Sequence, residues 1–129
     1  MQIHIVPNSS IPIFRQVADQ VRRLVATGKL RVGDSVPSVR QLAKDLVINP
    51  NTVAKAYAEL TRDGVLEGQQ GRGLFVAKRK SVFTKTERVR RLNESIERLI
   101  GDGLTLDFSS DEIIERVSLQ LEKLNHDAR

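Results

Sequence analysis

Several polar side chains at the start of one helix could recognise the edges of DNA bases. Asn49, Asn51, Thr52 and Lys55 lie in or near the first turn and a half of a helix opened by Pro50. Asn and Thr side chains offer donors and acceptors to base edges, and a lysine offers charge to phosphate or guanine. The positive end of the helix dipole also favours phosphates. This pattern predicts a helix whose N-terminal residues contact bases in the major groove.

The same residue types have a simpler explanation, because Asn and Thr are also preferred caps of helix N-termini. Asn49 directly precedes Pro50 and is sufficient to cap this helix. Asn51 and Thr52 are therefore not needed as caps. The segment that follows the helix adds weight to contact with DNA.

That segment is a hairpin whose tip, residues 70–73, reads Gln-Gly-Arg-Gly between strand candidates 66–69 and 74–77. Gly71 permits positive φ and close approach to a partner, and Arg72 can reach phosphate or a narrow minor groove. A plain hairpin turn is the alternative. A phosphate-binding nucleotide loop is disfavoured because this Gly-x-Gly joins two strands and does not open a helix.

Two helices must hold these groups in place. Ser38 followed by Gln41 is a capping box, in which Gln41 reaches back to the amide of Ser38, so a helix is expected to start at Ser38. The next helix starts at Asn49 and ends at Gly64, a residue suited to the left-handed position after a helix. Their inward apolar residues are Leu42, Ala43, Leu46, Val53, Ala56, Tyr57 and Leu60. Two helices followed by a hairpin predict a winged helix-turn-helix.

The N-terminal segment is expected to support this unit. Ile3 and Ile5 alternate with polar residues, which predicts a short strand paired with the sheet of the hairpin. A helix then runs from Pro12 to a stop at Gly28. Three of its arginines are interpreted as a solvated polar face: Arg15, Arg22 and Arg23.

The ordered motif from Pro12 to Val76 resembles the N-terminal domain of GntR-type bacterial transcription regulators. The matching segments are PIFRQVADQVRRLVATGKLRVGDSVPSVRQLAKDL and NPNTVAKAYAELTRDGVLEGQQGRGLFV. The Asn-Pro-Asn-Thr-Val segment and the short C-terminal region are most similar to the YtrA-type branch. The resemblance implies a dimeric repressor. It also implies DNA contacts by Arg40, Asn49, Asn51, Thr52, Lys55 and Gly71.

One position departs from the pattern of the family. Many relatives carry glycine in the turn where this chain has Val47 between Leu46 and Ile48. A β-branched residue resists positive φ. The turn is therefore expected either to have negative φ or to be strained.

Composition restricts the location and the chemistry. The 129 residues include no cysteine, which excludes a disulfide scaffold and a thiolate metal site and suits a reducing cytoplasm. No signal peptide and no apolar run long enough to span a bilayer is present in the sequence. We expect a cytoplasmic protein with no membrane partner, no metal and no cofactor.

The charge is divided unevenly along the chain. Residues 1–80 carry 13 Lys and Arg against 6 Asp and Glu, a net charge of +7, and residues 81–129 carry 8 against 10, a net charge of −2. This supports a DNA-binding domain at 1–80 and a tail at 81–129 that avoids DNA. The basic run at 78–80 is interpreted as a solvated linker.

The tail is expected to contain two amphipathic helices, the first over residues 83–100. The segment Gly-Asp-Gly at 101–103 is predicted to break it, residues 104–108 to form a loop, and Ser110 to cap the second helix. Two such helices are too few for a core of their own, so a second copy is the expected partner, with folding back onto the first domain as the alternative. The predicted dimerisation residues are Val89, Leu92, Ile96, Leu99, Ile100, Ile113, Ile114, Val117, Leu121 and Leu124.

These features predict an α+β, mostly α fold, in which a winged helix-turn-helix precedes a two-helix dimerisation element. The function expected is a homodimeric, sequence-specific repressor that binds double-stranded DNA at an inverted-repeat operator. A winged-helix module for protein interaction and a non-specific DNA-binding protein remain alternatives.

An enzyme is disfavoured, since only His4 and His126 are histidines and no catalytic cluster is evident. An effector is not identifiable, because two helices leave little volume for a closed pocket.

Overall fold

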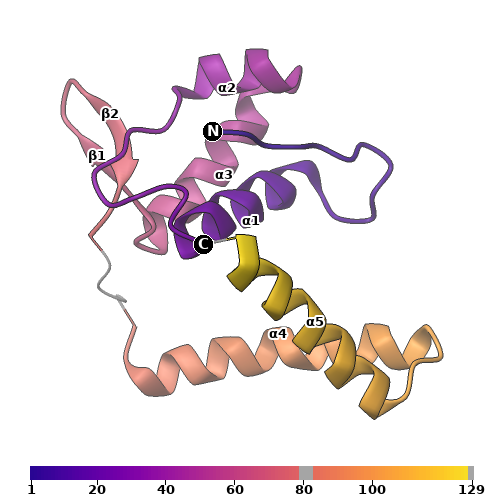
Figure 1. Cartoon of the computed structure of the whole chain (residues 1–129). Helices are drawn as coiled ribbons and strands as arrows, with labels where there is room; N and C mark the ends of the chain where they lie inside the picture. The colour runs from indigo at the N-terminus through magenta and orange to yellow at the C-terminus, as the bar shows by residue number, and fades with distance from the viewer. Residues whose placement is uncertain (79–82, 128–129) are drawn as a thin grey trace. The chain divides into compact units, whose positions relative to one another are not determined.

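A computed structural model describes residues 1–78 and 83–127 of the chain. The chain forms two compact units, Met1–Lys80 and Ser81–Arg129. The elements of the first unit are α1 (Ile13–Ala26), α2 (Val39–Leu46), α3 (Pro50–Arg62), β1 (Leu66–Gln69) and β2 (Gly73–Val76), and those of the second are α4 (Lys85–Thr105) and α5 (Ser110–Asp127) (Figure 1). Helices dominate and the two strands are antiparallel. The predicted mostly helical α+β class is confirmed.

The core of the first unit forms around α3, which packs against α1, α2 and β1. Apolar side chains from all of these elements meet there because each helix presents one apolar stripe. The buried cluster comprises Val17, Ala18, Val21, Val36, Leu42, Ala43, Val53, Ala56, Tyr57, Leu60, Leu66 and Val76. The inward stripes predicted for α2 and α3 are therefore confirmed, with Leu46 only partly buried at the edge.

The starts of α2 and α3 are set by side-chain caps. Ser38 Oγ accepts a hydrogen bond from the backbone N–H of Gln41 at 3.0 Å, and Asn49 Oδ1 accepts one from that of Asn51 at 2.8 Å. The reciprocal half of the predicted capping box is wrong. Gln41 Nε2 instead donates to Asp45 Oδ1 at 2.7 Å, one helical turn further on. An acceptor on the same face of the helix competes with the return bond to the cap.

The hairpin pairs β1 with β2 in a register that places Leu66 opposite Val76 and Gln69 opposite Gly73. Strand β2 therefore lies one residue before the predicted range. Its other edge is covered by the loop that leads to α2, since Val36 N–H donates to Leu74 O at 3.0 Å and Val76 N–H donates to Asp34 O at 2.8 Å. This hairpin, residues 66–76, is the wing, and main-chain hydrogen bonds anchor it to the rest of the first unit.

Residues 1–6 form no strand, so the predicted pairing with the wing is wrong. Two glutamines of α1 take the place of a neighbouring strand. Gln20 accepts from His4 N–H at 2.8 Å and donates to His4 O at 2.6 Å, and Gln16 makes the same pair of bonds with Val6 at 2.8 and 2.9 Å. Each side-chain amide offers both a donor and an acceptor, which satisfies both backbone groups of one extended residue.

Helix α4 is longer than expected at its C-terminal end. The hydroxyl of Thr84 accepts from Glu87 N–H at 3.2 Å and caps the start, and the helix then continues through Gly101 and Gly103. The predicted break at residues 101–103 is therefore wrong. Gly103 is buried, and a Cβ built on it would lie 2.7 Å from Ile113 Cδ1 of α5. This glycine gives α5 room to pack against α4.

The connection to α5 is shorter than predicted and begins after Thr105. Ser109, and not Ser110, forms the cap: its hydroxyl accepts from Glu112 N–H at 3.2 Å, and Glu112 Oε1 accepts from Ser109 N–H at 3.0 Å. These are the two reciprocal bonds of a capping box. The backbone bond from Ser109 is the main cause that lowers the pKa of Glu112.

Across residues 1–78 and 83–127, the helices are too short or too polar to traverse a bilayer.

Two alanine substitutions two residues apart test the packing role of Gly103. Gly101→Ala should raise the free energy of unfolding by about 0.5–1 kcal/mol, because alanine is the better helix former and nothing lies near the added methyl group. Gly103→Ala should lower it by about 1–3 kcal/mol, because the methyl group must displace Ile113. Thermal unfolding at one protein concentration measures both, and an equal gain in the two variants would contradict the packing role.

Candidate nucleic-acid interface

A buried tyrosine links the two helices of the helix-turn-helix. The hydroxyl of Tyr57 in α3 donates to the carbonyl of Pro37 at 2.8 Å, directly before the Ser38 cap of α2. Burial raises the pKa of Tyr57 above its ordinary value, so the hydroxyl remains protonated and keeps its role as donor. The bond holds the start of α2 beside the middle of α3.

The turn between α2 and α3 is strained. Val47 has φ +55° and ψ +50°, a left-handed conformation, and its side chain is 89% exposed. Of the two possibilities left open by the sequence, the strained turn is correct. The conformation allows Ile48 N–H to donate to Ala43 O at 3.0 Å, which closes the end of α2 and turns the chain into the next helix.

The first turn of α3 leaves one amide side chain unused. Asn49 Oδ1 serves as the cap, as described above, and Thr52 is half-buried. Asn51 is exposed, and within residues 1–78 and 83–127 its side chain has no hydrogen-bond partner. A free amide at an exposed helix start is available to a base edge, whereas Thr52 is less accessible.

Further along the exposed face of α3, the side chains are small or basic. Ala54 and Ala58 are exposed and short, which permits close approach by a partner. Lys55 lies between them along the helix, and its Nζ is 3.9 Å from the centre of the Phe14 ring of α1. Sequence reasoning missed Phe14, because only the packing of α1 on α3 brings it beside Lys55.

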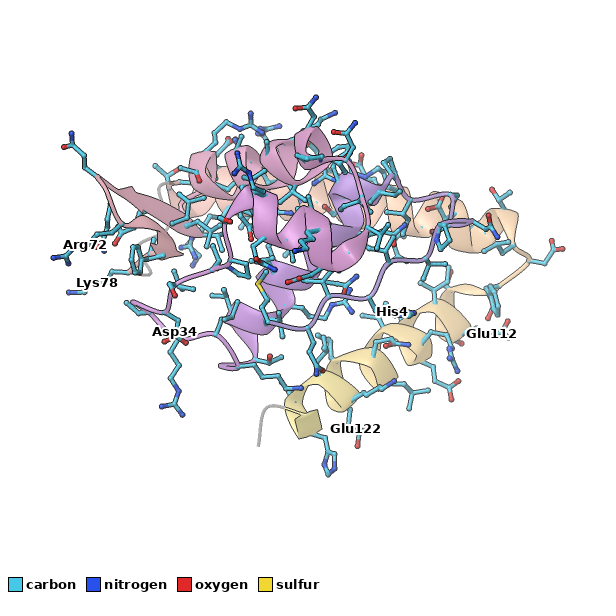
Figure 2. The ribbon with its side chains drawn as sticks, turned by 90° about the horizontal axis from the view of Figure 1, so that it is seen from above. His4, Asp34, Arg72, Lys78, Glu112 and Glu122 are labelled. Atoms are coloured by element: carbon cyan, nitrogen blue, oxygen red, sulfur yellow. The ribbon has the colours of Figure 1, made fainter. Side chains whose placement is uncertain are left out.

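Two arginines predicted to contact DNA have no side-chain partner among the described residues. Arg40, in the first turn of α2, and Arg72, at the wing tip, are exposed, and neither side chain forms an ion pair or hydrogen bond within the described part of the chain. Figure 2 shows Arg72 at the free end of the hairpin, pointing away from the helices. Gly71 has φ +74°, so the tip needs glycine for its backbone conformation.

Two of the three arginines of α1 have a different role from the one predicted. Arg15 Nη1 lies 2.7 Å from Glu59 Oε2, while Arg22 Nη2 lies 3.2 Å from Glu59 Oε2 and 2.8 Å from Asp63 Oδ2. The interpretation as a solvated face is therefore wrong for Arg15 and Arg22, which tie α1 to α3. Arg23 is exposed and forms no ion pair within the described residues.

The basic run at 78–80 follows the hairpin. Lys78 is exposed just beyond β2 (Figure 2), and Arg79 and Lys80 of the predicted linker lie outside the described residues. In the described ranges, no three histidine, aspartate or glutamate side chains come together as a metal site would require. The residues predicted to bind DNA lie in α2, in α3 and its cap, and in the hairpin of the first unit.

Both the sequence and the fold are similar to those of known regulatory proteins. The family model described as bacterial regulatory proteins, gntR family, matches residues 13–76. The HTH-type transcriptional repressor YtrA of Bacillus subtilis is 39% identical over 101 residues, which cover 78% of each chain. A transcriptional antiterminator from Listeria monocytogenes has a similar structure, with a TM-score of 0.85, 26% identity and coverage of 97% of this chain and 93% of that one. The DNA-binding domain of AraR in complex with operator ORX1 has a TM-score of 0.53 at 25% identity and covers 60% of this chain and 96% of its own.

The strain at Val47 can be measured directly. Val47→Gly should raise the free energy of unfolding by about 1 kcal/mol, because a left-handed conformation is unfavourable for a residue with a Cβ and acceptable for glycine. Val32→Gly is the matched control, since Val32 is exposed at negative φ and the same change there should give no gain. Denaturant unfolding compares the two. A gain at Val32 that equals the gain at Val47 would argue against strain in the turn.

Proposed function

This chain belongs to the GntR family of bacterial regulatory proteins, and from that premise we propose that it is a cytoplasmic, homodimeric repressor that binds an inverted-repeat operator. Its relatives are transcription regulators, and the chain is a regulator with a winged helix-turn-helix domain and not an enzyme. One observation carries the proposal of sequence-specific binding: the amide of Asn51 at the start of α3 is exposed and has no partner among the described residues. It is the group best placed to distinguish one base pair from another.

The proposed division of labour follows from exposure and chemistry. Asn51 reads a base edge, and Thr52 adds a contact of shorter reach because it is half-buried. Arg40 and Arg72 supply charge to phosphates or a groove, and Gly71 lets the wing tip approach. The contacts to phosphates fix the orientation of α3, and the contacts to bases supply the sequence preference.

The proposed dimer is supported by the exposure of the second unit. Among residues 83–126, whose exposure is described, only Gly103 is buried. Apolar side chains with more than a third of their surface exposed include Val89, Leu92, Ile96, Leu99, Ile100, Leu104, Ile114, Val117 and Leu121. Ile113 and Leu124 are partly buried. Such a concentration of exposed apolar surface is typical of a protein interface, and twofold pairing would double the half-sites that are read.

The proposal is tested by titrating a pool of random duplex DNA with the purified full chain at two salt concentrations and sequencing the bound fraction. Enrichment of an inverted repeat is the expected result. Salt-sensitive binding without enrichment would support a non-specific DNA-binding protein. Absence of binding would favour a winged-helix module that recognises protein.

Replacement of Asn51 separates base reading from general affinity. Asn51→Ala should weaken binding to the enriched duplex by about 1–3 kcal/mol and leave binding to a scrambled duplex nearly unchanged. Its side chain forms no hydrogen bond in the described part of the chain, so the fold should be preserved. Fluorescence anisotropy measures both affinities. Equal losses on the two duplexes would refute base reading by this residue.

A charge placed in the apolar stripe of α4 tests the dimer. Ile96→Glu should convert a species of twice 14.5 kDa into one of 14.5 kDa, because a carboxylate cannot be buried there without a partner. Glu97→Gln changes the neighbouring polar position and should leave the dimer intact. Sedimentation equilibrium measures the mass. A monomeric wild-type protein would instead support folding of the tail onto the first unit.

A further inference from the structure

One aromatic ring in the first unit is in contact with two cations. The centre of the Phe14 ring lies 3.9 Å from Lys55 Nζ and 5.1 Å from Arg15 Cζ. The guanidinium of Arg15 is also paired with Glu59 at 2.7 Å, and the Glu59 side chain is only 13% exposed. Within the described residues, Lys55 has no carboxylate partner. The uncompensated positive charge of this cluster therefore belongs to Lys55.

The contact restrains a side chain that would otherwise be mobile. Lysine carries its charge on a flexible four-carbon stem, and an ammonium over an aromatic face is attracted by the negative charge of that face. The ring satisfies one side of the ammonium and leaves N–H groups on the other side free to donate. Lys55 is exposed on α3, one turn beyond Asn51, so its charge is held on the surface that is proposed to meet DNA.

We propose that Phe14 of α1 is a positioning residue for DNA binding, which holds the Lys55 ammonium ready to donate to a phosphate. This inference rests on the proposed function and adds to it a residue outside the helix-turn-helix and the wing. The advantage is one of preorganisation. A lysine that is already ordered in the free protein loses less conformational freedom when the complex forms.

The contact itself can be tested without DNA. In the free protein, the ε-methylene protons of Lys55 should resonate upfield of those of the other lysines, because their carbon is bonded to Nζ, which lies 3.9 Å from the centre of the Phe14 ring. Phe14→Leu should abolish the shift, and Phe14→Tyr should retain it. A Lys55 resonance that is the same in wild type and Phe14→Leu would show that the ring does not hold the ammonium, and the inference would be overturned.

The consequence for binding is measured on the duplex enriched from the random pool. Lys55→Met should weaken binding about tenfold and lower the salt slope by about 1, because one phosphate contact is lost. Phe14→Leu should weaken it about two- to fivefold with a nearly unchanged salt slope, because the contact is still made but is no longer ordered in advance. Phe14→Tyr should bind like the wild type. Lys29→Met, in the turn after α1, is the charge-matched control and should change little.

The decisive comparison is the double variant. In the Lys55→Met background, Phe14→Leu should cause no further loss, because the ring has no ammonium to position. Independent, additive losses would assign Phe14 a purely structural role, and tighter binding by Phe14→Leu would show that the ring sequesters Lys55. Thermal unfolding of each variant identifies any loss of fold. If the wild type binds no duplex, the proposed function itself fails, and this inference fails with it.

Discussion

The structure of the first unit depends on one constraint: α3 must be buried along one face and open along the other. Val53, Ala56 and Leu60 are completely buried, and α1, α2 and β1 all pack against this helix. The Tyr57 hydrogen bond and the ion pairs of Arg22 add directional contacts to that packing. A helix held on three sides cannot easily rotate or slide. Its exposed face therefore has a fixed orientation before any partner arrives, which reduces the entropy lost on binding.

The same constraint explains why the chain tolerates strain at Val47. The end of α2 and the cap of α3 are separated by only Val47 and Ile48, so the chain must change direction within two residues. A left-handed residue provides that change of direction. The strain of about 1–2 kcal/mol expected for a residue with a Cβ is offset by the packing of both helices, which over-determines the turn. The turn is thus imposed by tertiary packing and not by the preference of its own residue.

Most of what the sequence predicted well is local, although the return bond of Gln41 and the cap at Ser110 were local predictions that the structure corrects. The caps Ser38 and Asn49 and the left-handed Gly64 act within a few residues of themselves, so their types and spacing were sufficient. The glutamine clamps on residues 1–6 and the packing of Gly103 against Ile113 depend on partners in other segments of the fold, and the corresponding predictions were wrong. For the candidate site, sequence reasoning found side chains that are exposed on α2, α3 and the wing, but the contact of Phe14 with Lys55 required the packing of α1 on α3.

The two units differ in how each reaches stability, and this difference has a consequence for regulation. The first unit is built around a core of its own, whereas Gly103 is the sole buried residue between positions 83 and 126. If the apolar surface of the second unit is covered by another copy, dimer assembly depends on protein concentration, while the fold of the first unit does not. Operator binding and dimerisation are then linked. When one first unit of the dimer occupies a half-site, the effective concentration of the other first unit at the second half-site rises. Because this linkage is reciprocal, anything that weakens the pairing of α4 and α5 with a second copy would also weaken operator binding, without contacting α3.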